Sequence, residues 1–409
     1  MEDAMIARWQ LEELKHKLTY RRGVHLTGVR QSGKSTLAGM LDLANSRHYT
    51  LDDKTIRAVA ESDPNGFVKH GIGETLIIDE VQKVPALLES VKMVVDNDNS
   101  KGQYLLTGSS NLLFAQAVKD SLAGRLGKIR LRPLAYGEIL GNSPDFLDRA
   151  FDGSLERTYA DIDKRGIIAL AMTGGYPEPM EFSFGERKTW FREYVDDILS
   201  KDVQDVTEVR KLDVLGAMTQ WLLAHSAQFF SIDELAAKVS VSKVTVENYL
   251  GVLKALYLFD RIPAWSKSDY AFLGKRPKWI AGDTGLMASI LGWTAEGVYL
   301  DESKNGKFIE SWVYQQLAAI AEVSQEYEIS HYRDNNKREI DFIVERADGA
   351  TLGIEVKAGT ASVNDFKHLK WFGENLAQGD YTGIVLYSGN RVLRFGDGYY
   401  AVPLSALGE

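Results

Sequence analysis

The chain has 409 residues, a net charge of −9 at neutral pH and no cysteine. This length predicts two or three domains, and the lack of cysteine excludes disulfides, thiolate metal sites and a cysteine nucleophile. No apolar run approaches the ~18 residues of a membrane helix, and the acidic start lacks the features of a signal peptide. We therefore expect a cytoplasmic protein without membrane contact, in which nucleic acid would need a local basic patch.

The first third of the chain has the pattern of an α/β fold. Residues 1–20 are expected to form an amphipathic helix, because Ile6, Trp9, Leu14 and Leu18 are spaced for one face. From residue 23 to about residue 140, short β-type runs alternate with helical runs. This alternation predicts a parallel sheet covered by helices.

The stretch from Gly28 to Ser35 fits the pattern G-x-x-x-x-G-K-S/T of a phosphate-binding loop. A short apolar strand precedes it and a helix follows it, so loop N–H groups would face an anion. Lys34 would reach the β- and γ-phosphates of ATP, and the Ser35 hydroxyl would hold Mg²⁺. The predicted nucleotide-binding residues are Gly28, Val29, Arg30, Gln31, Ser32, Gly33, Lys34, Ser35, Thr36 and Asp79.

Two carboxylates end the apolar run Thr75–Ile78, the arrangement known as Walker B. Asp79 would position Mg²⁺, and Glu80 would activate the attacking water. An apolar strand that ends in acidic residues is common on its own. Its place downstream of the phosphate loop makes the catalytic interpretation the stronger one.

The next predicted strand ends in small polar residues, and an arginine follows farther on. Thr107, Ser109 or Ser110 would act as a sensor of the γ-phosphate, and Ser109 is the residue assigned to this role; the alternative is a simple turn. Arg125 would stabilise γ-phosphate charge, either in its own chain or across a subunit interface. A surface ion pair explains Arg125 equally well.

The order of these motifs resembles a prokaryotic AAA+-like P-loop ATPase family with a C-terminal extension called domain of unknown function 4143 (DUF4143). Val29 departs from the family, which often has proline at this variable position. The resemblance implies ATP and Mg²⁺ as ligands and allows a homo-oligomer in which Arg125 acts on a neighbouring subunit. The segments that carry it are Leu26–Ser35, Asp79–Gln82, Leu106–Ser110, Gly124-Arg125 with Pro133-Leu134, Gly174–Pro177 and Tyr194–Val203.

Residues 231–250 have the pattern of a helix-turn-helix and predict a winged-helix-like module. Ser231 would cap the first helix with Glu234 three residues on. Residues 238–278 contain eight basic and three acidic residues, an excess that favours contact with DNA phosphates. Such modules also serve as protein-docking or lid domains, and this alternative stays open. The residues expected nearest DNA are Ser242, Lys243 and Thr245.

The last hundred residues predict a second α/β domain, with strands near 328–333, 339–346, 350–356, 382–387 and 391–394. Asp341 followed by Glu355-Val356-Lys357 resembles the core of restriction-endonuclease-like PD-(D/E)XK nucleases. Glu355 and Lys357 lie two apart and would share one strand face. The resemblance implies Mg²⁺ held by Asp341 and Glu355, an additional acid in Glu310, and Lys357 as the residue that generates or orients hydroxide.

We therefore expect an Mg²⁺-dependent ATPase coupled to DNA binding. The nuclease-like domain either cleaves DNA with a metal ion or only holds it, and both alternatives stay open. The alternative is a nucleotide-switched regulatory or toxin–antitoxin-type protein whose C-terminal half binds a partner protein. The expected domains are a P-loop ATPase domain (1–142), a helical lid or linker (143–230), the winged-helix-like module (231–300) and the nuclease-like domain (301–409).

Overall fold

The computed structural model describes residues 6–41, 43, 45–71, 73–108, 122–202, 211–267 and 276–409. The chain folds into two compact units. The first comprises Met1–Pro133, Val195–Leu212 and Ala255–Tyr257, and the second comprises Leu134–Tyr194, Asp213–Lys254 and Leu258–Glu409. None of the helices in the described ranges combines the length and apolar character that a membrane crossing needs.

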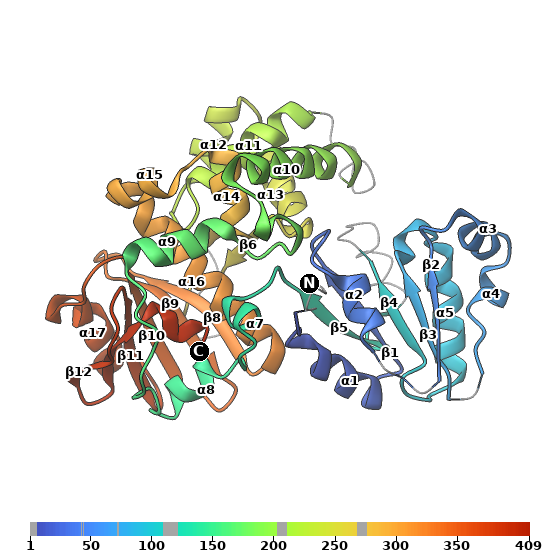
Figure 1. Ribbon diagram of the computed structural model, residues 1–409, viewed down its shortest axis with the longest axis horizontal. Helices are drawn as coiled ribbons and strands as arrows, with labels where there is room; N and C mark the ends of the chain where they lie inside the picture. Colours follow the sequence, from blue (N-terminus) through green and yellow to red (C-terminus); the bar gives the residue numbers. More distant parts are fainter. Residues whose placement is uncertain are drawn as a thin grey trace. The chain divides into compact units, whose positions relative to one another are not determined.

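The first unit is built on a five-stranded sheet with the order β2-β3-β4-β1-β5, and all its strand pairs are parallel (Figure 1). The predicted α/β fold class is thereby confirmed. The strands are β1 (Gly23–Gly28), β2 (Ser46–Thr50), β3 (Thr75–Asp79), β4 (Tyr104–Thr107) and β5 (Leu126–Leu131). The helices are α1 (Gln10–Tyr20), α2 (Lys34–Gly39), α3 (Lys54–Ser62), α4 (Pro64–Phe67), the 3-10 turn η1 (Val81–Lys83) and α5 (Ala86–Asn97).

Helices cover both faces of this sheet because side chains alternate along each strand. On β3, Ile77 packs with Leu14 of α1 and Leu37 of α2 in one core cluster. Its neighbours Leu76 and Ile78 belong to the opposite cluster, with residues of α3 and α5. The helix predicted for residues 1–20 begins only at Gln10, so Ile6 and Trp9 lie before it.

The carboxyl ends of three strands meet at one edge of this sheet. The register pairs Leu26 of β1 with Thr107 of β4, and Leu106 of β4 with Ile78 of β3. The phosphate loop follows β1, and Asp79 ends β3. Open α/β sheets bind ligands at this edge, so the fold brings together motifs that lie far apart in the sequence.

The second unit begins with helices. These are α7 (Tyr136–Leu140), α8 (Phe146–Phe151), α9 (Lys164–Thr173), the 3-10 turn η2 (Glu178–Glu181), α10 (Phe184–Asp197), α11 (Leu212–Ala224), α12 (Ile232–Val239) and α13 (Lys243–Ala255). The π-helical turn η3 (Ile198–Asp202), which follows α10, belongs to the first unit. The antiparallel pair β6 (Phe259–Ile262) and β7 (Lys278–Ala281) comes next. Three helices follow: α14 (Thr284–Leu291), α15 (Ala295–Leu300) and α16 (Glu302–Ser324).

A mixed six-stranded sheet completes the second unit, in the order β12-β13-β11-β10-β9-β8 (Figure 1). One face carries a core cluster that includes Leu369 and Phe372 of α17, while α16 contacts β8 and β10. The elements are β8 (Tyr327–Arg333), β9 (Glu339–Arg346), β10 (Thr351–Lys357), the 3-10 turn η4 (Val363–Phe366), α17 (Lys367–Asn375), β11 (Tyr381–Tyr387), β12 (Leu393–Gly396), β13 (Tyr399–Pro403) and the 3-10 turn η5 (Leu404–Leu407).

Candidate functional site

Two glycines shape the backbone of the phosphate loop. Gly28 has a φ of +152°, and a Cβ atom there would lie 2.2 Å from the carbonyl oxygen of Leu131. Gly33 has a φ of +91° and directly precedes α2. A side chain would be strained at either position, so the loop requires glycine at both ends to turn from β1 into the helix.

Lys34 and Arg8 donate hydrogen bonds to backbone carbonyl oxygens of the loop. The Lys34 ammonium is buried and donates to the carbonyl oxygens of Val29 at 2.9 Å and Gly28 at 3.2 Å. The Arg8 guanidinium donates through Nη1 to the Ser32 carbonyl at 2.7 Å and through Nη2 to the Arg132 carbonyl at 2.7 Å. Arg8 therefore ties the loop to the end of β5, a role that no motif indicated.

The carboxyl ends of β3 and β4 are joined by a side-chain hydrogen bond. The fully buried Thr107 hydroxyl donates to the carboxylate of Asp79. Glu80 follows in the left-handed conformation, with a φ of +56°, and accepts a hydrogen bond from the amide of Gln82. Asp79 and Glu80 thus have fixed partners at the edge that carries the loop.

The other loop residues lie around this centre. Val29 and Ser32 are buried, and the Ser32 hydroxyl donates to the Val29 carbonyl at 2.9 Å. Arg30 is partly exposed and Gln31 is exposed. Ser35 and Thr36 are exposed in the first turn of α2, where their hydroxyls can meet a ligand.

The structure does not bring Arg125 to the loop. Arg125 immediately precedes Leu126, which pairs with Gly23 at the amino end of β1, whereas the loop starts at the opposite end. At about 3.3 Å per residue, the two positions are about 20 Å apart. Arg125 instead forms an ion pair with Asp96, in which Nη2 donates to Oδ2 at 2.9 Å and lowers the pKa of that carboxyl. The proposed sensor Ser109 and its neighbour Ser110 lie outside the described residues.

This edge of the sheet fits Mg²⁺ and ATP. Lys34 offers a cation, Ser35 a hydroxyl and Asp79 a carboxylate, which are the groups that phosphates and Mg²⁺ select. No side chain projects from Gly33, and among the described residues a Cβ built there would have one neighbour within 4 Å, Arg8 Nη1 at 3.7 Å, so the backbone is open to a phosphate at this point.

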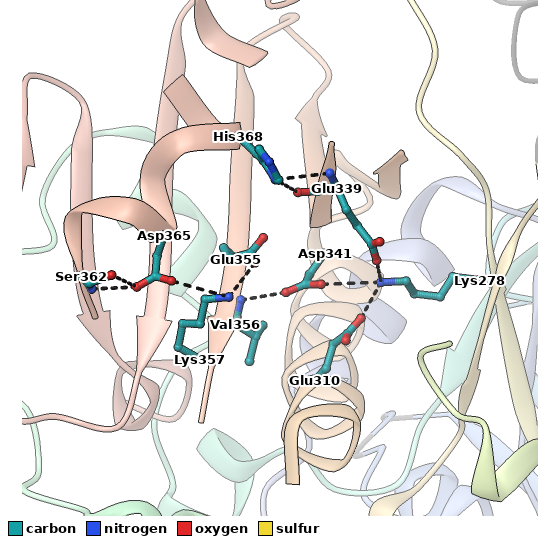
Figure 2. A network of polar contacts seen from close by, with 10 residues as sticks. All are labelled: Lys278, Glu310, Glu339, Asp341, Glu355, Val356, Lys357, Ser362, Asp365 and His368. Carbon is teal, nitrogen blue, oxygen red and sulfur yellow. Dashed lines mark hydrogen bonds and ion pairs between the residues drawn. The ribbon is translucent and has the colours of Figure 1, made fainter. Parts of the chain in front are cut away.

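The second unit brings together the nuclease-like residues (Figure 2). Glu310 comes from α16, Asp341 from β9, and Glu355 and Lys357 from β10. Residues 342 and 354 are register partners in the antiparallel pair, so Asp341 and Glu355 follow at facing positions. Lys357 Nζ lies 2.9 Å from Glu355 Oε1 and 3.7 Å from Asp365 Oδ1.

A lysine that the motif does not include lies among these carboxylates. Lys278 at the start of β7 is completely buried, and its Nζ lies 2.7 Å from Glu310 Oε1 and 3.6 Å from Asp341 Oδ1 (Figure 2). Glu339 Oε1 is 3.5 Å from the same nitrogen. The only sequence signal for it is a charged residue directly before an apolar strand.

Burial and mutual repulsion perturb the acids of this cluster. Burial, with a further contribution from Asp341, raises the pKa of Glu310 to about 8 and that of Glu355 to about 8. Burial alone would lower the pKa of Lys278, but Glu310, Asp341 and Glu339 outweigh it and raise that pKa above its ordinary value. Lys278 is therefore a charged ammonium.

These residues do not fit a divalent ion as they stand. The Lys278 ammonium lies against Glu310 and Asp341, two of the three expected ligands. The other oxygen of Asp341, Oδ2, accepts a hydrogen bond from the Val356 amide at 2.9 Å. Across the described ranges of the chain, no set of three or more His, Asp or Glu side chains is placed to hold one metal ion.

The predicted helix pair is present as α12 and α13, and each helix has a serine cap, as was predicted for Ser231. Ser231 Oγ accepts from the Glu234 amide at 3.0 Å, and Ser242 Oγ accepts from the Thr245 amide at 3.1 Å. At the start of α13, Lys243 pairs with Asp233 at 2.5 Å. Lys278 is one of the eight basic residues counted in this region, and its burial removes it from any surface patch.

Three regions of the chain match known family models. Residues 20–140 match an AAA domain, residues 164–297 match the domain of unknown function DUF8612, and residues 305–407 match DUF4143. An uncharacterized protein of Mycobacterium tuberculosis is 27% identical over 351 residues, which are 82% of this chain and 72% of that protein. An uncharacterized protein of Methanocaldococcus jannaschii is 22% identical over 84% of this chain and 77% of its own length.

Solved structures of AAA+ ATPases give weak overall matches. RuvB of Thermotoga maritima is 18% identical, with a TM-score of 0.26 over 62% of this chain and 86% of its own. The Aeropyrum pernix Orc1 protein in complex with DNA is 14% identical, with a TM-score of 0.28 over 69% of this chain and 91% of its own. The family models confirm the predicted resemblance: residues 20–140 are similar to an AAA domain and residues 305–407 are similar to DUF4143.

Proposed function

We propose that the first unit binds ATP with Mg²⁺ and hydrolyses it. The observation that carries this proposal is the shared edge of β1, β4 and β3. The loop with Lys34, which a glycine begins and ends, follows β1 at this edge, and the hydrogen-bonded pair of Thr107 and Asp79 ends β4 and β3 at the same edge. The match of residues 20–140 to an AAA domain supports the same activity.

Each side chain has a distinct task in this proposal. Lys34 exchanges the carbonyls of Gly28 and Val29 for phosphate oxygens. Glu80, whose backbone turn and bond to Gln82 fix its position, orients the attacking water and accepts its proton. Ser35 and Asp79 would hold Mg²⁺, which when bound neutralises charge on the phosphates.

The test measures nucleotide affinity and phosphate release on the full chain. Lys34→Ala is expected to lose ATP binding, whereas Glu80→Gln is expected to keep binding and to lose hydrolysis by about 100-fold or more. Lys69→Ala, on an exposed residue of the same unit, is the control and should match the wild type. Absence of ATP binding in the wild type, or unchanged hydrolysis in Glu80→Gln, would refute the proposal.

A second function, DNA contact by α12, α13 and the β6–β7 pair, is supported by their capped helix-turn-helix order. Ser242 and Lys243 are exposed at the start of α13, and Arg261 is exposed on β6. With about two phosphate contacts, from Lys243 and Arg261, we expect an affinity that falls by about tenfold between about 50 mM and 200 mM salt.

Fluorescence anisotropy with labelled duplex and single-stranded DNA, with and without ATP, tests this contact. The Lys243→Ala/Arg261→Ala variant should weaken binding and reduce the salt slope. If neither DNA form binds under any of these conditions, the DNA proposal fails, and a protein partner for the second unit becomes the better explanation.

A further inference from the structure

We propose that the Lys278 ammonium permanently occupies the cation position of the carboxylate cluster in the second unit. The carboxylates of this nuclease-like site then have their counter-charge from the protein itself and do not bind a divalent metal ion. The inference concerns Glu310, Glu339 and Asp341, the acids around Lys278, and it is independent of ATP hydrolysis in the first unit. It assigns Lys278 a role that the PD-(D/E)XK pattern does not contain.

The position of Lys278 supports this role geometrically. Its side chain is 0% exposed, and its nitrogen faces three acids that come from α16 and β9 (Figure 2). A buried carboxylate needs a cation or hydrogen-bond donors close by, and a metal ion or an ammonium can meet that need. The ring of Phe229 lies 5.3 Å from Lys278 Nζ and helps to enclose it.

The remaining groups around the cluster are also engaged with partners of the protein itself. Asp341 uses Oδ1 toward Lys278 and Oδ2 toward the Val356 amide. Glu355 Oε1 is bound by Lys357, and Glu339 also faces Arg333 at 3.9 Å. Mg²⁺ requires near-ideal octahedral oxygen ligands, so an incoming ion would have to displace a fully buried ammonium.

Because Lys278 lies on β7, its ion pairs connect two separate sheets of the second unit. β7 pairs with β6, the strand that follows α13, whereas Glu310 and Asp341 belong to α16 and β9. The ion pairs therefore anchor the β6–β7 pair to the six-stranded sheet. A metal ion in the same place would satisfy the carboxylates but would leave β7 without this anchor.

Binding of Mn²⁺ to the full chain, in the absence of nucleotide, tests the inference. Electron paramagnetic resonance of free Mn²⁺ gives the number of ions bound per chain for the wild type, Asp341→Asn, Lys278→Met and the Lys278→Met/Asp341→Asn double variant. All four proteins share the same first unit, so any ion bound there cancels in each comparison.

We expect the wild type and Asp341→Asn to bind equal numbers of ions. Lys278→Met should bind one more ion than the double variant, and Mn²⁺ should raise the Tm of Lys278→Met by more than it raises the Tm of the double variant. One additional ion in the wild type relative to Asp341→Asn would overturn the inference, as would a folded Lys278→Met that gains no ion. If Lys278→Met does not fold, the number of ions bound by the wild type is compared with the numbers bound by Asp341→Asn and by Glu310→Gln. Equal numbers support the inference, and one additional ion in the wild type overturns it.

Discussion

The Arg8 guanidinium donates a hydrogen bond to the carbonyl oxygen of Ser32 at 2.7 Å, inside the phosphate loop. Its second bond, to the carbonyl of Arg132, also measures 2.7 Å and joins the loop to the end of β5. A residue that precedes the first helix thus holds the loop in the shape that Gly28 and Gly33 permit. Loop geometry in this unit depends on residues outside the loop.

Arg8→Ala is therefore expected to weaken ATP binding. It leaves two carbonyl oxygens without their donor, at a cost of about 1–3 kcal/mol for each one that stays buried. We expect KM for ATP to rise by about tenfold, with a smaller effect on kcat, because Arg8 shapes the loop and does not contact the reacting atoms. Steady-state kinetics and the Tm of the same preparations provide the measurement. A KM equal to that of Lys69→Ala would contradict this role.

Thr107→Val removes the only hydroxyl shown to donate to Asp79 in the described structure, with little change in volume. We expect kcat to fall by about tenfold and the free energy of unfolding to fall by about 1–3 kcal/mol, because a buried carboxylate loses a donor. Thr75→Val is the matched control, since its hydroxyl donates to Gly102 at the opposite end of β3. An equal loss of kcat in both variants would show that Thr107 acts only through stability.

Arg125→Ala separates a role within one chain from a role between chains. Arg125 lies at the amino end of the strands, whereas the loop lies at their carboxyl end. The kcat of a monomer should therefore stay within about twofold of the wild type. Loss of an arginine that contacts the γ-phosphate costs about 10³ in kcat. A loss of that size, seen only at protein concentrations where the chain self-associates, would place Arg125 in a neighbouring subunit's site. Asp96→Asn serves as the control for the ion pair.

Gly175→Ala is expected to destabilise the second unit. The Gly175 amide donates to Asp283 at 2.7 Å, and an added Cβ would lie 2.2 Å from the carbonyl oxygen of Leu134, which cannot move freely. We expect a loss of about 2 kcal/mol or more in the free energy of unfolding. Gly251→Ala on α13 has open space and should be neutral or stabilising by up to about 1 kcal/mol. Equal denaturation midpoints for the two variants would refute the steric argument.

The stability of the first unit should fall in mild acid because of His25. Burial, together with the nearby charges of Lys128 and Lys34, lowers its pKa from 6.5 to about 3. As the pH falls, the unfolded state therefore binds a proton at His25 before the folded state does. The contribution of neutral His25 to the free energy of unfolding is complete above pH 6.5 and is lost between pH 6.5 and about 3. The slope from this group is at most about 1.4 kcal/mol per pH unit.

Urea unfolding between about pH 7.5 and pH 5.5 measures this slope. His25→Leu should flatten the dependence, whatever its effect on stability at neutral pH. His16→Gln, on an exposed residue of α1, should keep the wild-type slope. A wild-type slope retained in His25→Leu would assign the pH dependence to other groups.

Local patterns in the sequence were sufficient for the phosphate loop and for most strands. Gly28 to Ser35 is contiguous, and its chemistry depends on a backbone turn that its own glycines permit. The predicted strands near 339–346 and 350–356 match β9 and β10 closely, since alternation of apolar residues is itself a local signal. β13 (Tyr399–Pro403) was not predicted.

Side-chain partners across the fold could not be predicted in this way. Which residue meets Asp79 depends on β4 lying between β1 and β3, and the distance of Arg125 from the loop depends on the register of β5 against β1. No periodicity in the sequence encodes strand order or register between distant segments, because those follow from how whole faces pack.

The sequence by itself determined that this chain carries a P-loop, an acid pair and an acid–acid–lysine set, because each of these is a short pattern of residue types. Only the tertiary structure decided that Arg8 clamps the loop and that Lys278 lies among Glu310, Glu339 and Asp341. The physical reason is that a buried charge is stable only beside a partner of opposite charge, which the fold can supply from any part of the chain. The ammonium beside Asp341 comes from a strand 63 residues earlier in the chain, 278 to 341.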